Sequence, residues 1–440
     1  MHLAAHFPGV DNTTVWADPD SGSQIEFASF EHLARTAERG LFDFFFLTGG
    51  LRLREHKGRM HDLDVVGRPE PITVLNALAA VTERLGLAAT VNATFNEPYE
   101  LARRFATLDH LSSGRAAWNV VTSSDAFTGE SFRRGGYLDR AERYTRAAEF
   151  LDIARELWDS WTPDGTPRPF AHRGRYFDIA GEFSLPRPPQ GHPVVLLAGD
   201  SDEGREFAAS AADVVFSGWG SGGHPPGRSS TRQSSLEDGR AFYADVKRRL
   251  AKYGRARGDV KIMHRVGVVL GDTAAEAQER AAEIRRQRTS PQTALLTLEQ
   301  IWGVDLSSYD PDGPLPDIDP VVGPALTRGR TRRGDTVAIA EKWRALSKEK
   351  GLSIRETVIE ADGDLFLTGT PEAVADELDE HVRRGAADGF LLVPHPTPGG
   401  LDEFVDRVVP LLQERGAFRT EYRGTTLRSH LGLPAPGSTG

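Results

Sequence analysis

The sequence predicts an α/β fold, a (β/α)8 TIM barrel that forms a single domain over residues 1–440 and carries several insertions. Apolar runs alternate with segments of helical periodicity, and the alternation comes to eight units. Runs such as FDFFFL and PVVLLAG are continuous, which is typical of parallel strands buried on both faces. A doubly wound sheet is the alternative, but the first strand-to-helix turn lacks the Gly-x-Gly-x-x-Gly pattern of dinucleotide-binding folds.

The predicted strands are apolar runs that stop where polar or turn residues begin. In chain order they are His2–Phe7, Phe42–Thr48, Leu85–Thr94, Ala116–Thr122, Pro193–Gly199, Asp213–Gly218, Ile262–Gly271 and Phe390–His395. The predicted helices are Ile25–Gly40, Pro71–Gly86, Pro98–Ser112, Arg140–Trp161, Asp202–Ala212, Leu236–Gly254, Ala274–Gln287, Pro371–Gly385 and Leu401–Gly416.

The first two helices illustrate the evidence for the rest. Phe27, Phe30 and Leu33 repeat at helical spacing, and Gly40 stands where a helix C-cap is expected. The second helix begins with Pro71, which suits the first helical turn because that position needs no backbone N–H.

Insertions account for the length that a barrel does not need. A (β/α)8 barrel takes about 250 residues, so roughly 190 remain. We expect them at Gly49–Arg68, Ser124–Asp139, Thr162–His192, Trp219–Ser235 and above all Thr289–Gly369. The last segment is rich in Pro, Gly and Asp, and its run Tyr309–Gly323 is close to low complexity. We expect this segment, residues 289–369, to act as a lid over the barrel.

Composition excludes several classes of function. The chain has no cysteine, which removes disulfides, zinc–thiolate and iron–sulfur sites, and predicts a cytoplasmic location. No apolar run approaches the roughly 20 residues of a membrane span. The net charge is −10 and basic residues are dispersed, so neither nucleic acid nor a membrane is an expected partner.

Polar residues gather at the predicted C-terminal ends of the strands, where the active site of such a barrel lies. Strand ends meet polar loops in any protein, so the set carries more weight than its members. The residues of interest are His6, Thr48, Asn92, Thr94, Asn119, Thr122, Ser123, Gly199, Ser201 and His395.

The segment AGDSDEGREFA predicts an anion site. It leads from a buried strand through Gly199 to Ser201, a candidate N-cap, and into a helix that begins at Asp202. Free backbone N–H groups at a helix start bind anions, and the serine hydroxyl adds a donor. A simple capped helix explains the same residues, and Asp202 and Glu203 would partly repel an anion.

The segment GRAAWNVVTSS places Asn119 on the opposite face of its strand from Val120, with Thr122 and Ser123 at the rim. An Asn119 side chain aimed into the barrel is a buried amide that needs partners, which a heteroaromatic ring could supply. A core asparagine satisfied by the protein is the alternative. Tyr144, in the first turn of a following helix, is able to reach the same rim.

Residues 52–64, RLREHKGRMHDLD, hold two histidines and two aspartates, but neither pair has ligand spacing, and no metal is expected. Arg52, Arg54, Lys57 and Arg59 make the stretch locally cationic. It could meet a carboxylate or sulfonate substrate, in which case alanine at Arg52 and Arg54 would raise KM. A solvated loop, with a neutral sulfur or nitrogen heterocycle as substrate, is the other interpretation.

Four segments together carry a resemblance. They are residues 96–123 (NEPYELARRFATLDHLSSGRAAWNVVTS), 142–161 (ERYTRAAEFLDIARELWDSW), the pair 172–179 and 198–218, and residues 369–393 followed by VVPLLQERGAFRTEY. In order and spacing the chain resembles the flavin-dependent monooxygenases of the bacterial-luciferase-like superfamily, in the branch of nitrilotriacetate, dibenzothiophene-sulfone and long-chain-alkane monooxygenases.

The resemblance implies a two-component system. Reduced FMN would come from a separate NAD(P)H-dependent flavin reductase, and dioxygen would react with it to a flavin hydroperoxide that oxygenates a small organic substrate. A lid would exclude the water that turns such an adduct into hydrogen peroxide. A homo-oligomer, either a dimer or a tetramer, is also implied.

The resemblance assigns roles to individual residues. Asn119, Thr122 and Ser123 would lie along the flavin and its ribityl chain. Tyr144, Ser201 and the Asp202 amide, next to Gly199, would hold the phosphate. The isoalloxazine pocket would be lined by Asn92 and Thr94, with Thr48 at the end of the second strand.

Two departures affect catalysis. Relatives often have an acidic residue where this chain has Gly49, and some have a histidine where it has Ser124. The candidate catalytic residues are therefore His6, Asn119 and His395. The alternatives are a deazaflavin-dependent hydride-transfer enzyme on the same fold and a catalytically idle barrel that serves as a binding subunit.

Overall fold

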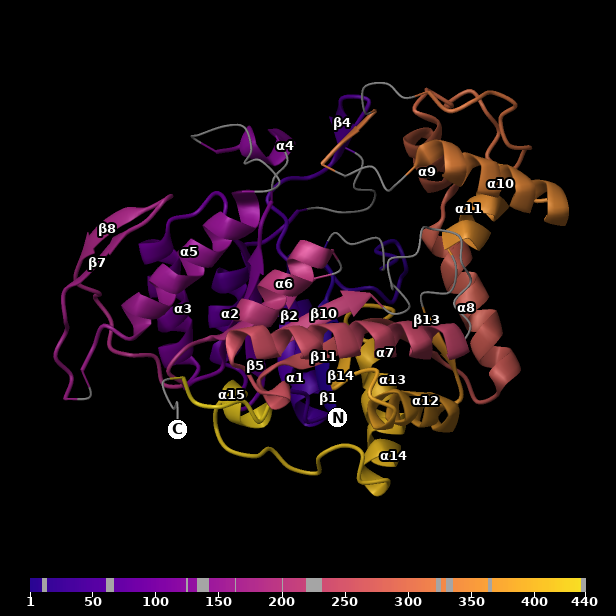
Figure 1. Ribbon diagram of the computed structural model, residues 1–440. Helices are drawn as coiled ribbons and strands as arrows, with labels where there is room; N and C mark the ends of the chain where they lie inside the picture. The colour runs from indigo at the N-terminus through magenta and orange to yellow at the C-terminus, as the bar shows by residue number, and fades with distance from the viewer. Residues whose placement is uncertain are drawn as a thin grey trace.

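A computed structural model shows a closed barrel of eight parallel strands, with helices outside it (Figure 1). The structure describes residues 1–9, 14–60, 67–123, 126–132, 142–162, 164–199, 201–218, 232–321, 326–329, 335–362 and 366–436. The barrel strands are β1 (His2–Phe7), β2 (Phe44–Leu47), β5 (Gly86–Asn92), β6 (Ala116–Val121), β9 (Val194–Ala198), β10 (Val214–Gly218), β11 (Lys261–Leu270) and β14 (Gly389–Val393).

Strand order around the barrel follows the chain. Each strand pairs in parallel with the next, β10 pairs with β11, and β14 pairs with β1 to close the ring. All eight predicted strands are present, and the predicted (β/α)8 fold is confirmed. β13 (Phe366–Gly369) adds a ninth parallel strand outside the ring, paired with the end of β11, which the sequence analysis did not predict.

The predicted helices are present, and most of their ends agree to within a few residues. They are α1 (Phe27–Arg39), α2 (Pro71–Ala79), α3 (Pro98–Leu111), α5 (Glu142–Trp158), α6 (Asp202–Ala211), α7 (Arg232–Arg249), α8 (Ala274–Arg288), α12 (Pro371–Arg383), α13 (Gly400–Arg407) and α14 (Val409–Glu414). The exceptions are α2, which ends at Ala79 rather than at Gly86, and the predicted helix Leu401–Gly416, which is divided at Val408 into two helices. Gly40 is the C-cap of α1, and Pro71 stands in the first turn of α2, both as expected. Two 3-10 turns, Leu250–Tyr253 and Arg257–Asp259, lie between α7 and β11.

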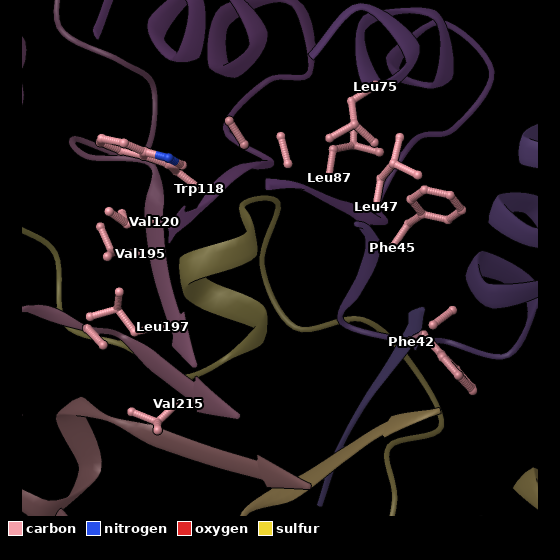
Figure 2. Packing of buried hydrophobic residues seen from close by; sticks show 14 of the residues in the cluster. Phe42, Phe45, Leu47, Leu75, Leu87, Trp118, Val120, Val195, Leu197 and Val215 are labelled. Atoms are coloured by element: carbon pink, nitrogen blue, oxygen red, sulfur yellow. The ribbon is translucent and has the colours of Figure 1, made fainter. Parts of the chain in front are cut away.

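Side chains alternate between the two faces of each strand. Those that point outward, such as Leu87, Trp118 and Val195, pack against the helices in the largest hydrophobic cluster (Figure 2). Those that point inward, such as Phe44 and Leu196, form a second cluster inside the barrel. Because both faces are apolar, the strands read as continuous hydrophobic runs in the sequence.

The C-terminal segment closes the bottom of the barrel, at the opposite end from α4 (Ala126–Gly129) (Figure 1). Leu427 of α15 (Leu427–His430) packs into the inner cluster together with Leu431 and Leu433. Arg428 donates to both carboxylate oxygens of Asp213, at 2.9 and 3.2 Å. The sequence predicts no helix or strand after Gly416, because the segment is short and irregular.

The 289–369 insertion contains helices with a hydrophobic cluster of their own. They are α9 (Pro291–Trp302), α10 (Thr336–Lys350) and α11 (Ile354–Asp362), and the indole rings of Trp302 and Trp343 lie 6.3 Å apart. Trp302 Nε1 also donates to the carbonyl of Ile318 at 2.9 Å. The described part of the Tyr309–Gly323 run is therefore packed against α9 despite its biased composition.

Smaller strands decorate the barrel. β7 (Phe170–Arg173) and β8 (Asp178–Gly181) form a hairpin within the predicted 162–192 insertion. β3 (Glu55–His56), β4 (Arg59–Met60) and β12 (Thr327–Arg328) form a three-stranded sheet above the barrel. The 219–231 part of the predicted 219–235 insertion lies outside the described residues. Among the helices of the described residues, none combines the length and apolar character needed to cross a membrane.

Arg428→Met is expected to lower the free energy of unfolding by about 3–5 kcal/mol, because it leaves the buried Asp213 carboxylate without its cation. Burial alone would raise the pKa of Asp213, but the Arg428 guanidinium outweighs it and holds that pKa below its usual value. Urea unfolding measures the change. Arg104→Met, at an exposed position on α3, is the matched control, and equal losses for the two variants would contradict the structural role of Arg428.

Candidate active site

The predicted polar residues come together at the C-terminal mouth of the barrel. His6, Thr48, Asn92 and Asn119 occupy strand positions that alternate with outward-facing ones, in register with the inward-facing side chains of the inner cluster. Four neighbouring strands thus present polar side chains to one opening. The expectation that Asn119 points into the barrel agrees with this alternation.

Two of these residues are amides with atoms that no protein group satisfies. Asn119 Nδ2 donates to Thr90 Oγ1 at 3.0 Å, but its Oδ1 is buried without a hydrogen-bond partner. Asn92 Oδ1 accepts from the backbone N–H groups of Thr94 and Phe95, at 2.6 and 3.1 Å, while its Nδ2 is buried and unpartnered. The described protein groups therefore satisfy the Asn119 amide only in part, and buried polar atoms generally have partners.

His6 and Thr48 are joined across β1 and β2. His6 Nε2 is hydrogen-bonded to Thr48 Oγ1, and the imidazole packs on Phe46 with ring centroids 5.1 Å apart. His6 is only 3% exposed. A hydroxyl and an aromatic ring thus help to set the orientation of this imidazole.

Gly49, one of the two departures noted in the sequence, directly follows Thr48. A Cβ atom at this position would lie 2.6 Å from the Thr90 carbonyl oxygen and 2.8 Å from Pro71. Contacts this short exclude a side chain without movement of the backbone. Close packing around Gly49 thus leaves no room for a side chain there. Ser124, the other departure, lies outside the described residues.

His395 follows β14 at the same mouth. It is half-buried, its Nδ1 has no hydrogen-bond partner, and burial lowers its pKa to about 4. The imidazole is therefore neutral at pH 7. A neutral imidazole can accept a proton or a hydrogen bond, but it is no source of positive charge.

The predicted anion site has the expected local geometry. Ser201 is the N-cap of α6, and its Oγ accepts from the Gly204 backbone N–H at 3.1 Å. A Cβ on Gly204 would lie 3.3 Å from the Tyr144 hydroxyl, so Tyr144 reaches the same helix start. A Cβ on Gly199 would lie 3.0 Å from the Gly204 carbonyl oxygen, so the strand end and the first turn of α6 approach closely.

The repulsion that the Asp202 carboxylate would exert on an anion at the start of α6 is reduced by an ion pair. The carboxylate is exposed and pairs with Arg249 of α7. Arg143 also donates to the Tyr144 hydroxyl at 3.1 Å and lies over its ring. Thr122 and Ser123 follow β6 at the rim and are half-buried.

A cavity of about 350 Å³ opens beside Thr48, at the ends of β1 and β2. Thr48, Gly49 and Gly50 form part of its wall, and the arginines Arg54, Arg68 and Arg265 also line it, together with Gln24. Of the three arginines, only Arg54 is a candidate from the sequence. The sequence contains a sign of Arg265. It stands two residues after Met263 in a predicted buried strand, so the two side chains face the same way, and Met263 faces inward.

Two other cations of the 52–59 stretch are engaged by the protein. Arg52 donates to Glu130, at 2.7 Å, and to Glu55, at 3.1 Å, and Lys57 pairs with Glu299 and Asp305. Arg52 is therefore engaged in ion pairs above the mouth, and it is not among the described residues that line the cavity. Of the four cations in the stretch, Arg54 alone is among the described residues that line the cavity.

Those ion pairs connect three insertions above the mouth. Arg328 of β12 also pairs with Glu130 and Glu55, and the guanidinium groups of Arg52 and Arg328 lie 3.7 and 4.6 Å from the centre of the Phe127 ring. The hairpin after β2, helix α4 and the 289–369 insertion are thereby joined. Figure 1 shows α4, β4 and α9 on the same side of the barrel.

A second junction fastens the helical part of the insertion to the hairpin. His56 bonds to Thr327 Oγ1 at 2.8 Å through Nδ1 and to Glu299 through Nε2. Glu299 is 3% exposed and also accepts from the Leu306 N–H at 2.7 Å. His56 thus has a structural role, while His61, Asp62 and Asp64 lie outside the described residues. Among the residues that are described, no group of three or more His, Asp or Glu could hold a metal ion.

Comparison with known proteins decides the family. A family model described as luciferase-like monooxygenase matches residues 7–389. The chain belongs to the luciferase-like monooxygenase family. It is a flavin-dependent monooxygenase, and this family supports that activity over the deazaflavin alternative.

Curated relatives match along nearly the whole chain. Nitrilotriacetate monooxygenase component A from Aminobacter aminovorans is 38% identical, over 96% of this chain and 92% of the relative. Dibenzothiophene-sulfone monooxygenase from Rhodococcus erythropolis (strain XP) is 38% identical, over 99% of this chain and 97% of the relative. The predicted branch of the superfamily is therefore confirmed.

Solved structures agree. EDTA monooxygenase from Chelativorans sp. superposes with a TM-score of 0.73 at 27% identity, covering 99% of both chains. The coenzyme F420-dependent tetrahydromethanopterin reductase from Methanopyrus kandleri has a TM-score of 0.55 at 14% identity, over 93% of this chain and 99% of that chain, and shares the fold alone.

The His395 ring is expected to titrate near pH 4 rather than near 6.5, because burial disfavours its charged form. NMR of protein labelled with ¹³C-histidine, followed from about pH 8 down to 4, measures this directly. His395→Asn identifies the resonance by removing it. A His395 resonance that titrates near 6.5 would show that the imidazole is accessible to water.

Glu299→Gln is expected to loosen the contact between the hairpin and the helical insertion, because the amide lacks the charge that His56 and Lys57 pair with. Hydrogen–deuterium exchange of the Leu306 amide and of residues 55–60 should accelerate by roughly tenfold. Glu283→Gln, an exposed change on α8, is the control. Unchanged protection in Glu299→Gln would show that the junction is held by other contacts.

Proposed function

We propose that the flavin is reduced FMN, bound across the mouth with its phosphate at the start of α6 and its ring over β5 and β6. The observation that carries this proposal is the pair of unpartnered amide atoms, Asn119 Oδ1 and Asn92 Nδ2, on neighbouring strands. One is an acceptor and the other a donor, which fits the edge of an isoalloxazine ring with its own N–H and C=O groups.

The proposed binding of the FMN phosphate depends on the start of α6. Ser201, the Asp202 backbone amide and the Tyr144 hydroxyl would hold the phosphate, with Gly199 allowing the ligand to approach the backbone. A helix start supplies free N–H groups and the positive end of the helix dipole. A phosphate also discriminates FMN from riboflavin, which has no such group.

The remaining residues would hold the middle and the ring of the cofactor. Thr122 and Ser123 lie at the rim after β6, between the two ends, and would bond the ribityl chain. Thr48 and Thr94 would line the ring pocket, Thr48 through the hydroxyl that already bonds His6. All these groups are fixed by strands or by their first loop residues, so the pocket is largely formed before the ligand arrives.

When bound, reduced FMN supplies the electrons that activate dioxygen for transfer of one oxygen atom to a small organic substrate. The chain itself would orient the ring and keep water out. His395, neutral at pH 7, and His6, held by Thr48, are the proposed groups that accept or return a proton beside the ring, and Asn119 holds the ring in place.

The insertions would provide the exclusion of water. The 289–369 segment is fastened through β12 to the hairpin and to α4, so these parts would act together as the lid. We further propose that residues 1–440 form one domain, with this lid as an insertion. Premature entry of water would divert the reaction to hydrogen peroxide.

A second component is part of the proposal. One relative is named component A of nitrilotriacetate monooxygenase, and two others are named as different subunits of pristinamycin IIA synthase, which supports a two-component system. We propose that the partner is an NAD(P)H-dependent flavin reductase that meets this chain transiently in the cytoplasm. A homo-oligomer, dimeric or tetrameric, belongs to the same proposal.

Anaerobic titration with photoreduced FMN tests the cofactor site. Asn119→Leu and Ser201→Ala are each expected to raise the Kd by about tenfold or more, because each removes a buried or charge-assisted hydrogen bond. Asn76→Ala, an amide on α2 that bonds only the Ile72 carbonyl among described groups, is the control.

Mixing the loaded protein with aerated buffer then follows oxygen use and hydrogen peroxide release. Slow peroxide release that accelerates in Asn119→Leu supports the monooxygenase site. If wild type binds neither reduced FMN nor a reduced deazaflavin, the proposal is wrong and a barrel without catalytic activity becomes the better account.

A further inference from the structure

We propose that the cavity beside Thr48 binds the anionic end of an organic substrate, a carboxylate or sulfonate, through Arg54, Arg68, Arg265 and Gln24. The cavity holds about 350 Å³, which suits part or all of a small molecule. This substrate class rests on the proposed monooxygenase site, because the anion would fix a molecule whose other end reaches the flavin.

Arg265 is a charged residue on the inner face of a barrel strand. Its strand neighbours on the same face are Met263, in the inner cluster, and Gly267. A guanidinium placed inside an apolar barrel loses hydration, which is unfavourable unless other groups or a ligand compensate. Its five N–H donors allow it to contact the protein and a ligand together.

Arg68 lies against a glycine that leaves room for it. A Cβ on Gly50 would lie 2.9 Å from both Cδ and Cζ of Arg68, so the guanidinium packs directly on the Gly50 backbone. Gly50 and Arg68 therefore form one wall of the cavity. Any larger residue at position 50 would push the charge away from its present place.

Arg54 is positioned from above by the 289–369 insertion. A Cβ on Gly329, which follows β12, would lie 3.3 Å from Cγ of Arg54, and Gly329 itself lines the cavity. The insertion that we propose as a lid thus contacts this charged wall. That contact helps to place Arg54 at the cavity wall.

Gln24 supplies an independent sign of a ligand. It is 4% exposed, it lines the cavity, and its Oε1 is buried without a hydrogen-bond partner. The oxygen and nitrogen of an amide can exchange places by a flip, so the same side chain can donate to an anion. A buried amide atom without a partner beside a cavity is completed most simply by a bound polar group, and in the flipped orientation that atom is the N–H donor that an anion requires.

The chemistry of the lining favours an anion over a neutral molecule. Among the described lining residues there are three arginines and no carboxylate. Guanidinium groups bind carboxylates and sulfonates through paired N–H donors, and they do so more strongly where water is excluded.

The position separates this site from the one proposed for the flavin phosphate. The cavity lies at the ends of β1 and β2, whereas Ser201 follows β9, the fifth strand of the ring when β1 is counted as the first. The two anion sites therefore lie on opposite sides of the mouth. Thr48 belongs to the cavity wall and also bonds His6, so a substrate held by the arginines would extend toward the residues proposed for the ring.

Two probes of equal length test the proposal, 2,2'-thiodiglycolate and the neutral 2,2'-thiodiethanol. Saturation-transfer NMR titrations at low ionic strength measure both Kd values on the full-length protein. Thiodiglycolate is expected to bind at least about tenfold more tightly, and added salt should weaken it selectively. Equal Kd values, or no detectable binding of thiodiglycolate, would overturn the proposal.

Variants then identify which residues bind the anion. Arg265→Gln and Arg68→Gln should each weaken thiodiglycolate by about tenfold, Arg265→Lys by less, and Gly50→Ala should weaken it by displacing Arg68. Arg104→Gln and Gly258→Ala, remote positions with room for the change, should leave its Kd unaltered. Circular dichroism and the Kd for reduced FMN show whether each variant is folded.

The outcomes distinguish this inference from the proposed function. If reduced FMN fails to bind wild type while thiodiglycolate binding still depends on the arginines, the flavin proposal fails and the anion site stands. If Arg265→Gln weakens reduced FMN but leaves thiodiglycolate unchanged, Arg265 serves the flavin and the inference is overturned.

Discussion

Closure of eight parallel strands into a ring is the constraint on which the rest of the molecule depends. Each strand is hydrogen-bonded on both edges, so its side chains can only face the helices or the barrel interior. Outward residues such as Trp118 and inward residues such as Phe44 both lie in apolar clusters. The strict two-residue alternation then places every second side chain at a strand end over the mouth.

The site follows from that alternation. Asn92 and Asn119 stand at inward positions near the mouth, where each keeps a buried atom without a partner among the described protein groups. The bottom of the barrel is instead sealed by Leu427 and its neighbours, with Arg428 fixed on Asp213. One end of the ring is therefore closed by apolar packing and an ion pair, whereas the other end presents polar side chains, which is the end where active sites of this fold generally lie.

The insertions matter because they are connected to one another. A network of ion pairs around Phe127 and Glu130 joins the hairpin after β2, α4 and β12, and Glu299 adds a buried junction to the helices of the insertion. Surface ion pairs contribute little individually, but a network with a buried member holds a definite arrangement. Insertions that are joined in this way can form part of a cavity wall, and Gly329 does so where it lies against Arg54.

The sequence by itself determined the eight strands, their helices, the caps at Gly40 and Ser201 and the family, because these depend on local periodicity and on motifs read along the chain. It also placed Asn119 correctly, since strand alternation is a local property. Tertiary structure alone decided which charges face the cavity: Arg52 pairs with Glu130 and Glu55 instead, whereas Arg68 and Arg265 converge on its wall. Those arrangements join residues far apart in the chain, and no local pattern encodes them.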